Sequence, residues 1–343
     1  MKKYTLAFFL FLFCGFLVFS AETAKPKEGE GIYKFLRNNG RNPKEHYDSF
    51  VELNKNKFGK NYALLKGVTY TLPPITGSAA NSKATLITES SGNNTTKSNV
   101  NVETLFGKKY SEYTINSNKL KGATFYLVSG HGGPDCGAIG YANGAAIHEN
   151  EYAYDIMLRL ARNLKMEGAT VHIIIQDKYD GIRDEQFLKN YNRETCRGKT
   201  IPRNQVKRLQ QRCDEINALS RQSKDKYQRA VFIHLDSRSK NQKLDVFFYY
   251  KRDSASGKYL ARTMQETFKD RYHAHQADRG FSGTISPRDL YVLKNTTPVS
   301  LFAELGNIQN SSDQQRFLSS DNRQALAKWM CLGFIADYQN AKK

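Results

Sequence analysis

Beyond its first twenty residues the sequence lacks any apolar run long enough to span a bilayer. This absence excludes a protein that stays threaded through the membrane once its leader is removed. In the leader itself, Lys2 and Lys3 precede an apolar stretch over residues 4–19, and Ser20 ends an acceptable cleavage site. We therefore expect residues 1–20 to be a secretory signal peptide, with an uncleaved anchor as the alternative, and the chain to be exported to the periplasm or cell envelope.

Cysteine is scarce, with five residues among 343. Four of them follow the leader, and an exported protein meets an environment in which disulfides can form. Four cysteines permit three sets of pairs, so the sequence leaves the connectivity open, with Cys196–Cys213 closing the shortest loop. The four residues are Cys136, Cys196, Cys213 and Cys331.

Acidic residues are also few, since 33 Asp and Glu against 52 Lys and Arg give a formal net charge of +19. No single basic run stands out along the chain, and an exported protein rarely meets nucleic acid. We therefore expect no nucleic-acid partner. Anionic polymers of the cell envelope are the expected partners, with a merely well-solvated surface as the alternative explanation of the charge.

Composition divides the chain after the leader into three parts. Residues 26–75 have a compact pattern, and residues 76–119 contain a linker rich in Ser, Thr and Asn followed by a lead-in. Over residues 120–343, short apolar runs alternate with helical patterns. This alternation indicates an α/β domain with a single, mostly parallel sheet of about six strands flanked by helices.

The apolar periodicity predicts the elements of this domain. Strands are expected at residues 124–128, 170–175, 230–233, 244–250, 290–294 and 299–303. A helix is expected around the periodic run 152–164, ended by Gly168, and further helices at about residues 205–220, 257–272 and 312–339. The segment 178–202 is charged and irregular, and we expect it to be a surface insertion.

The stretch SGHGGPDCGAIG, residues 129–140, places five glycines around one histidine directly after the apolar run TFYLV. A plain turn needs only one or two glycines. The sequence therefore predicts that the backbone passes close to other groups here, and that small residues leave room for a metal and a bulky substrate.

Three of the expected strands end in residues that can carry chemistry. His131 follows the first strand, His234 follows AVFI, and Glu304 follows VSLFA. The carboxyl ends of strands in an open α/β sheet share one edge, and Glu149, at the start of the next helix, can face the same edge. Two histidines and one carboxylate form the ligand set of a catalytic zinc, and a second carboxylate can act as general base.

Each of these residues alone has an ordinary structural explanation. A histidine at a strand end is commonly a hydrogen-bonded structural residue, and an acid in the first turn of a helix complements the helix dipole. Glu304 is harder to explain, because an ionisable group beside a buried apolar run is costly. The convergence of all four on one edge is what favours a metal site.

Four motifs between residue 120 and the C-terminus resemble the zinc-dependent N-acetylmuramoyl-L-alanine amidases of the amidase-3 type. In chain order they are GHGGPDCGAIG, ENEYAYDIMLRLARNLKMEGATV, FIHLDS and TTPVSLFAELGNIQN. The resemblance implies one Zn²⁺ ion bound by His131, Glu149 and His234, with Glu304 as the catalytic carboxylate.

Two details of this resemblance stay open. His148 or Glu151 replaces Glu149 as the ligand if the helix begins at another residue. The family usually has proline at the position of Cys136. A thiolate there is chemically suited to zinc, but the implied ligand set is complete without it, so we expect Cys136 to be a small structural residue.

The segment 26–75 resembles LysM domains in three places: Gly29 to Ile32, Asn54, and the closing stretch from Gly67 to Pro73. The opening strand of that family is not evident in the sequence. The resemblance implies a small α+β module that binds glycans containing N-acetylglucosamine, and an unrelated α+β cap is the alternative.

Together these features predict a peptidoglycan hydrolase that acts on glycan strands carrying stem peptides. It would cleave the amide between N-acetylmuramic acid and L-alanine through zinc-activated water and a glutamate general base. A metallopeptidase acting on another stem-peptide bond and a non-catalytic peptidoglycan-binding envelope protein are the alternatives. Nothing indicates covalent catalysis, because the glycine-rich stretch contains no serine elbow.

Overall fold

The computed structural model describes residues 22–27, 30–59, 64–74, 100–237, 240–276 and 280–342. The chain forms two compact units, Met1–Gly92 and Asn93–Lys343, which are considered separately. The expected signal peptide and most of the expected linker lie outside the described residues. Of the helices that are described, none has both the length and the apolar character needed to cross a bilayer.

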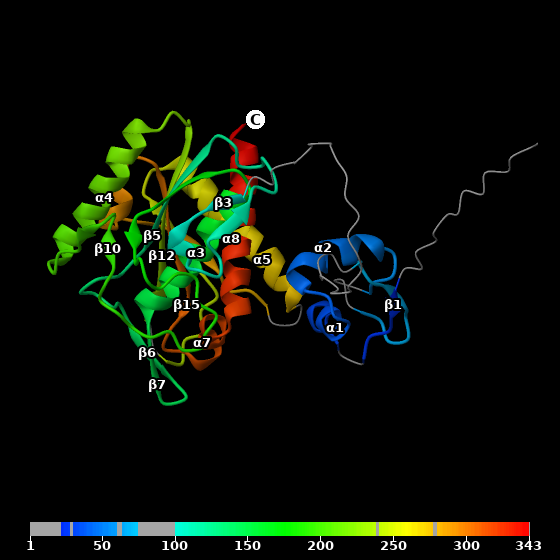
Figure 1. Cartoon of the computed structure of the whole chain (residues 1–343). Coiled ribbons are helices and arrows are strands. Elements are labelled where there is room, and N and C mark those ends of the chain that lie inside the picture. The colour runs from blue at the N-terminus through cyan, green and yellow to red at the C-terminus, as the bar shows by residue number, and fades with distance from the viewer. Residues whose placement is uncertain are drawn as a thin grey trace, which may run out of the picture. The chain divides into compact units, whose positions relative to one another are not determined.

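The larger unit is built on a six-stranded sheet with the order β14-β13-β15-β12-β5-β8 (Figure 1). Every neighbouring pair is parallel except β13 and β15, which run antiparallel. The strands are β5 (Ala123–Ser129), β8 (Thr170–Ile173), β12 (Tyr227–Asp236), β13 (Phe247–Lys251), β14 (Thr284–Arg288) and β15 (Val299–Asn307). The predicted α/β fold with a mostly parallel sheet of six strands is confirmed.

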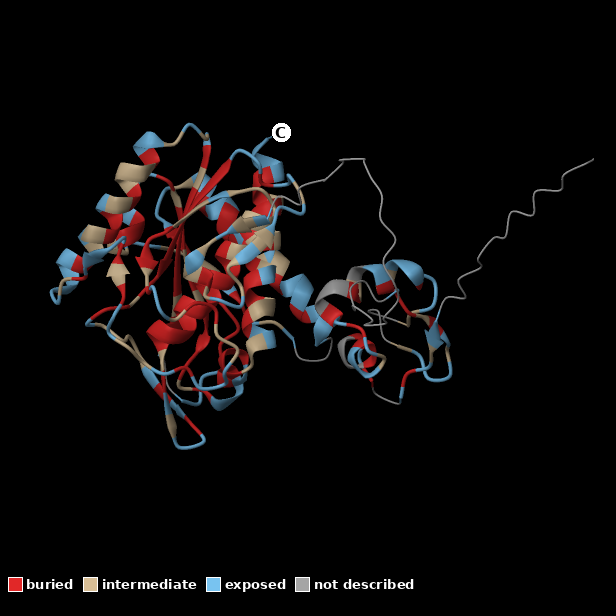
Figure 2. Ribbon diagram, viewed as in Figure 1, coloured by how far each residue is buried: buried red, intermediate tan, exposed pale blue. Residues whose placement is uncertain are grey.

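Helices cover both faces of this sheet, and its central strands are therefore buried on both sides (Figure 2). Because side chains alternate along a strand, Phe125 and Leu127 of β5 join one apolar cluster while Tyr126 and Val128 join the other. The first cluster is covered by α3 (Glu149–Met166), α5 (Ala255–His275) and α8 (Ser320–Ala341), and the second by α4 (Gln205–Gln222) and α6 (Tyr291–Asn295).

The expected strand at residues 290–294 is wrong, because residues 291–295 form the short helix α6. The sixth strand is instead β14, which lies at the edge of the sheet and pairs only with β13. Pro287 in β14 has no N–H to donate, which an edge strand tolerates. Val292 and Leu293 bury their side chains from a helix, and an apolar run this short does not distinguish helix from strand.

The single helix expected over residues 312–339 is also wrong, since two helices occupy this region. They are α7 (Ser311–Leu318) and α8, and the break falls at Ser319. The Ser319 side chain accepts a hydrogen bond from the backbone N–H of Asn322 and so caps the second helix. A capping serine inside an apolar periodic pattern turns the chain without interrupting that pattern.

The segment 178–202 is more than a surface insertion. It forms the strand β10 (Thr195–Cys196), which pairs with β9 (Ile175–Gln176) on one side and with β11 (Lys199–Thr200) on the other. Ile182 and Leu188 are buried in the main core. The prediction missed this packing, because the buried residues are spaced irregularly among charged ones.

All four cysteines of the larger unit are free thiols. Cys196 and Cys213 lie in the same apolar cluster but are not bonded to each other, so the shortest-loop pairing considered above is not present. Burial raises the pKa of the Cys196 thiol to about 11, which leaves it protonated at neutral pH.

The lead-in before the sheet packs against α3 from residue 100 onward. It contains β3 (Val100–Val102), the 3₁₀ helix η2 (Thr104–Phe106) and β4 (Glu112–Thr114). Phe106 is fully buried in the main core, and Glu103 forms an ion pair of 3.1 Å with Lys165 of α3. The tightly packed part of the larger unit therefore begins before its first central strand.

The smaller unit has the order strand, helix, helix, strand. Its elements are β1 (Thr23–Ala24), α1 (Ile32–Asn38), α2 (Pro43–Leu53) and the antiparallel partner strand β2 (Tyr70–Thr71). Phe35, Phe50 and Tyr70 are fully buried at its centre. The buried Asn54 exchanges two hydrogen bonds of 2.8 Å with the backbone of Thr71 and so ties the end of α2 to the closing strand.

A buried ionic cluster joins α3 to α8 in the larger unit. Oδ2 of Asp155 accepts hydrogen bonds from Nε of Arg159 at 2.8 Å and from Nε of Arg323 at 2.6 Å. Replacing Asp155 by Asn would leave two buried guanidinium groups without their carboxylate. We expect Asp155→Asn to lower the free energy of unfolding by about 3–5 kcal/mol, measured in urea by the fluorescence of Trp329, the single tryptophan.

The matched control is the exposed pair of Arg252 and Asp289 on the same unit, 3.1 Å apart. Water screens that pair, so Asp289→Asn should change the same quantity by less than about 1 kcal/mol. Equal effects of the two substitutions would contradict this account of the buried cluster.

Candidate active site

The carboxyl ends of β5 and β12 and the first turn of α3 bring three side chains together. His131 follows β5, His234 lies near the end of β12, and Glu149 is the first residue of α3. The Gly130 N–H donates to the carbonyl of Ile233 at 2.8 Å, which fixes the chain after β5 against its neighbouring strand. Parallel pairing thus delivers both histidines to one edge.

The carboxylate of Glu149 lies between the two imidazoles. Its Oε1 atom is 3.3 Å from Nε2 of His131 and 3.0 Å from Nδ1 of His234. One ligand atom from each of the three residues lies within 4.8 Å of the other two. Backbone N–H groups of Ala138 and Leu235 also donate to the carboxylate, at 2.9 and 3.0 Å.

Burial and hydrogen bonding shift the pKa values of this group in different directions. Burial lowers the pKa of His131, but hydrogen bonds with Asp135 and Glu149 outweigh that effect and raise it to about 9. Burial raises the pKa of Glu149, but the two histidines hold it well below its usual range. The pKa of His234 is lowered, chiefly by burial. Glu149 is therefore ionised, as a cation ligand must be.

The two alternatives to Glu149 point elsewhere. The helix begins at Glu149, and the side chain of Glu151 pairs with Arg183 at 2.7 Å. His148 precedes the helix and does not belong to the convergent group, and neither does Cys136, whose thiol lies 3.6 Å from the Gly137 carbonyl. Within the described part of the chain, only His131, Glu149 and His234 form such a group.

Close approach of neighbouring groups explains the glycines of the loop. A Cβ atom added at Gly130 would lie 1.8 Å from Nε2 of His234. At Gly137, whose φ is +68°, it would lie 2.7 Å from Oε2 of Glu149. The prediction that the backbone passes close to other groups here is confirmed, and the groups at these two positions are the side chains of the site.

Asp135 orients His131 from the side opposite Glu149. Its Oδ2 atom lies 2.9 Å from Nδ1 of His131 and accepts a hydrogen bond of 2.7 Å from Nη2 of Arg208 on α4. With Nδ1 engaged by a carboxylate, Nε2 is the ring nitrogen that faces Glu149. Asp135 belongs to the glycine-rich stretch, but the sequence predicted no role for it.

Glu194, from the segment 178–202, holds the glycine-rich loop in place through hydrogen bonds. Its Oε2 atom accepts a hydrogen bond of 3.0 Å from the N–H of Gly133, and its Oε1 atom accepts one of 2.9 Å from Nδ2 of Asn150. Both residues that it contacts adjoin the site. This segment, read from the sequence as an insertion, therefore holds the glycine-rich loop in place.

Glu304 lies on β15, directly beside His234 on β12 in the parallel register. Residues paired in this way project from the same face of the sheet. Phe302, two residues earlier on the same strand, stacks on the His234 ring with a centroid distance of 4.2 Å. The Oε2 atom of Glu304 is buried, and the residue is not a member of the convergent group.

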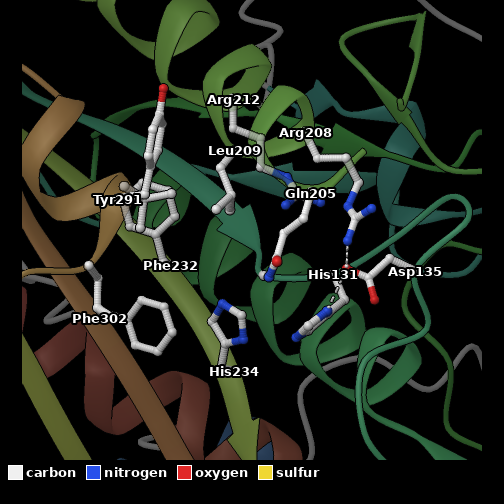
Figure 3. A pocket seen from close by; sticks show the side chains of 13 residues that line it. His131, Asp135, Gln205, Arg208, Leu209, Arg212, Phe232, His234, Tyr291 and Phe302 are labelled. Atoms are coloured by element: carbon white, nitrogen blue, oxygen red, sulfur yellow. Dashed lines mark hydrogen bonds and ion pairs between the residues drawn. The ribbon is translucent and has the colours of Figure 1, made fainter. Parts of the chain in front are cut away.

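A pocket of about 190 Å³ opens beside the two histidines, on the face covered by α4 and α6 (Figure 3). One wall is polar and includes Asp135, Arg208 and Arg212. The opposite wall is aromatic and includes Phe232 and Tyr291. The pocket can therefore take a ligand that combines an apolar part with an anionic group.

Sequence analysis did not identify the residues that α4 contributes to this pocket. Arg208 and Arg212 are four residues apart and share a helix face with the buried Ile216. Two arginines at helical spacing on an apolar face were the available signal, because a buried arginine is rare without a partner. Periodicity alone does not show that this helix face meets the strand ends.

The sequence is similar to that of a known protein family. The amidase-3 family model, described as N-acetylmuramoyl-L-alanine amidase, matches residues 126–336. No match is found among curated proteins.

Several solved structures are similar. The CwlD amidase of Clostridioides difficile, in complex with the GerS lipoprotein, shares 22% identity with a TM-score of 0.46, over 63% of this chain and 98% of that chain. An N-acetylmuramoyl-L-alanine amidase of Nostoc punctiforme shares 22% identity with a TM-score of 0.45, over 65% of this chain and 99% of that chain. The catalytic domain of CwlV from Bacillus (Paenibacillus) polymyxa shares 20% identity with a TM-score of 0.45, over 64% of this chain and 98% of that chain.

The close approach at Gly130 can be tested by adding one methyl group. Gly130→Ala should displace the His234 ring, because the new Cβ would lie 1.8 Å from Nε2. We expect the free energy of unfolding to fall by about 1–3 kcal/mol and the imidazole NMR signals of His234 to shift.

Gly144 provides the control, because a Cβ added there meets no heavy atom within 4 Å and adds only the strain of a φ of +80°. Gly144→Ala should cost about 1 kcal/mol and leave the His234 signals unchanged. Unshifted His234 signals in Gly130→Ala would show that the packing argument is wrong.

Proposed function

Because the chain belongs to the family of N-acetylmuramoyl-L-alanine amidases, we propose that it hydrolyses the amide between N-acetylmuramic acid and the L-alanine of the peptidoglycan stem peptide. The family match over residues 126–336 contains His131, Glu149, His234 and Glu304. The observation that carries the proposal is the convergence of two imidazoles and one carboxylate within 4.8 Å, beside a pocket.

The donor set of this group fits a Zn²⁺ ion. His131 Nε2, Glu149 Oε1 and His234 Nδ1 supply two imidazole nitrogens and one carboxylate oxygen, the ligand types of a catalytic zinc with an open fourth position. When bound, zinc supplies Lewis acidity, which polarises a carbonyl and lowers the pKa of water.

The surrounding residues prepare the three donors for this role. Asp135 engages Nδ1 of His131 and so leaves Nε2 available. The N–H groups of Ala138 and Leu235 hold the Glu149 carboxylate in one orientation and favour its ionised form. The phenyl ring of Phe302 stacks on His234 and restrains the rotation of its imidazole.

We assign the general base to Glu304. It accepts a proton from the attacking water and donates that proton to the leaving amine, so the carboxylate ends the cycle as it began. Its register position beside His234 and its place on the pocket's face of the sheet support this role.

We further propose that residues 26–75 bind the glycan strands of the same polymer. The order strand, helix, helix, strand with paired outer strands supports the LysM-like interpretation, as does the anchoring of Asn54 to the closing strand. The expected signal peptide supports export to the periplasm or cell envelope, where peptidoglycan is found.

The reaction is tested by digesting purified peptidoglycan and analysing the fragments by mass. The wild-type chain should release stem peptides with a new amino-terminal alanine and leave intact muramic acid. A chelator should abolish release, and added Zn²⁺ should restore it. Glu304→Gln should lower the rate by about 10²–10⁴-fold, because the proton transfer is lost.

Glu266→Gln, at an exposed position on α5, is the matched control and should leave the rate unchanged. Cleavage at another stem-peptide bond would instead indicate a metallopeptidase, and binding without release would indicate a non-catalytic protein. Equal rates for the wild type and Glu304→Gln would overturn the assignment of the base.

Glycan binding by the smaller unit is tested by sedimenting the full chain with insoluble peptidoglycan. Asn54→Ala should reduce the bound fraction several-fold, because Asn54 connects α2 to β2 through three hydrogen bonds. Glu52→Gln, two residues earlier at an exposed position of α2, should bind like the wild type. Equal retention of both variants would argue against the LysM-like role.

A further inference from the structure

Arg212 is a buried guanidinium in the pocket wall that lacks hydrogen-bond acceptors. The residue is only 2% exposed. Its Nε and Nη2 atoms are both buried, and no group in the described part of the chain accepts a hydrogen bond from either. Two unsatisfied donors on a buried charged group are costly, so their retention needs an explanation.

The neighbouring Arg208, by contrast, has hydrogen-bond acceptors for its guanidinium group. One turn earlier on α4, its Nη2 atom donates to Oδ2 of Asp135 at 2.7 Å, and its Nη1 atom donates to the carbonyl of Arg203. Asp135 also engages His131. The carboxylate nearest to Arg212 is therefore already committed to other donors.

Arg212 carries its charge at neutral pH. Burial lowers the pKa of its guanidinium to about 10, and the charge on Asp135 acts in the opposite direction. The positive charge of Arg208 is balanced by Asp135, whereas that of Arg212 is not balanced by any ion pair among the described residues. The polar wall thus holds one uncompensated positive charge.

The position of Arg212 relates this charge to the site. It lines the same pocket as His131 and His234 (Figure 3). A ligand that enters the pocket beside the histidines therefore meets the guanidinium.

We propose that Arg212 binds a carboxylate of the substrate's peptide, next to the bond that is cleaved. The nature of the substrate rests on the proposed function. Nε and Nη2 lie along one edge of the guanidinium, and this edge binds a carboxylate through two parallel hydrogen bonds. The pocket of about 190 Å³ has room for a short acidic side chain, and its aromatic wall can contact the aliphatic part of that side chain.

A binding experiment on the full chain tests this role directly, with the dipeptide alanylglutamate and its diamide as probes. The two probes differ only in their carboxylates. By calorimetry, the wild type should bind alanylglutamate on the order of 10- to 100-fold more tightly than the diamide, since charged hydrogen bonds are replaced by neutral ones. Arg212→Gln should bind the two probes equally.

The matched control is Arg221→Gln, at an exposed position on the same helix, which should keep the wild-type preference. Thermal unfolding separates a binding role from a structural one. Because no group among the described residues accepts a hydrogen bond from Nε or Nη2, Arg212→Met should unfold at the same temperature as the wild type or higher. A clear fall in that temperature would overturn the proposal.

Kinetics distinguish this inference from the proposed function. For two soluble muramoyl peptides that differ only in a free or amidated carboxylate, the wild type should show a 10- to 100-fold higher kcat/KM for the free acid, and Arg212→Gln a ratio near 1. An equal loss on both substrates would overturn the carboxylate role. If the wild type cleaves neither substrate but binds alanylglutamate through Arg212, the proposed function fails while the carboxylate site stands.

Discussion

The Glu149 carboxylate is the contact on which the rest of the site depends. It meets both histidines and two backbone N–H groups at the point where β5, β12 and α3 come together. A buried carboxylate is stable only with such partners. Two of those partners are imidazoles, whose nitrogens can bind a divalent cation together with the carboxylate oxygen. Folding of the sheet edge and preparation of the site are therefore one event.

Support for this contact comes from parts of the chain with little regular structure. The loop after β5 approaches the site so closely that Gly130 and Gly137 have no room for a Cβ atom. Glu194 fixes the loop through the N–H of Gly133. Asp135 holds His131 from its other side and ties it to Arg208 on α4. These restraints come from the loop itself, from the segment 178–202 and from α4, and they act on the loop and on His131.

The pocket wall contains buried hydrogen-bond donors without acceptors among the described residues, whereas the buried arginines of the core have carboxylate partners. Asp155 accepts hydrogen bonds from the buried Arg159 and Arg323, and Arg159 also pairs with Asp184, so both guanidinium groups between α3 and α8 have carboxylate partners within the protein. Arg212 is buried to a similar degree, yet its Nε and Nη2 donors are unmatched among the described residues. Arg159 and Arg323 therefore stabilise the fold, whereas we infer that the partner of Arg212 is part of a ligand.

The sequence by itself determined the α/β class and five of the six central strands, because buried strands leave local patterns. It also predicted that His131, His234 and a carboxylate from the start of the next helix share one edge of the sheet. It did not locate β14, the break at Ser319 or the packing of the segment 178–202, since edge strands, caps and irregular segments depend on neighbours distant in the chain. Only the tertiary structure decided that Glu149 rather than Glu151 meets the histidines, and that Arg208 and Arg212 face the pocket. The first outcome depends on the residue at which α3 begins, and the second depends on which strand ends α4 covers. The periodicity of apolar residues determines neither.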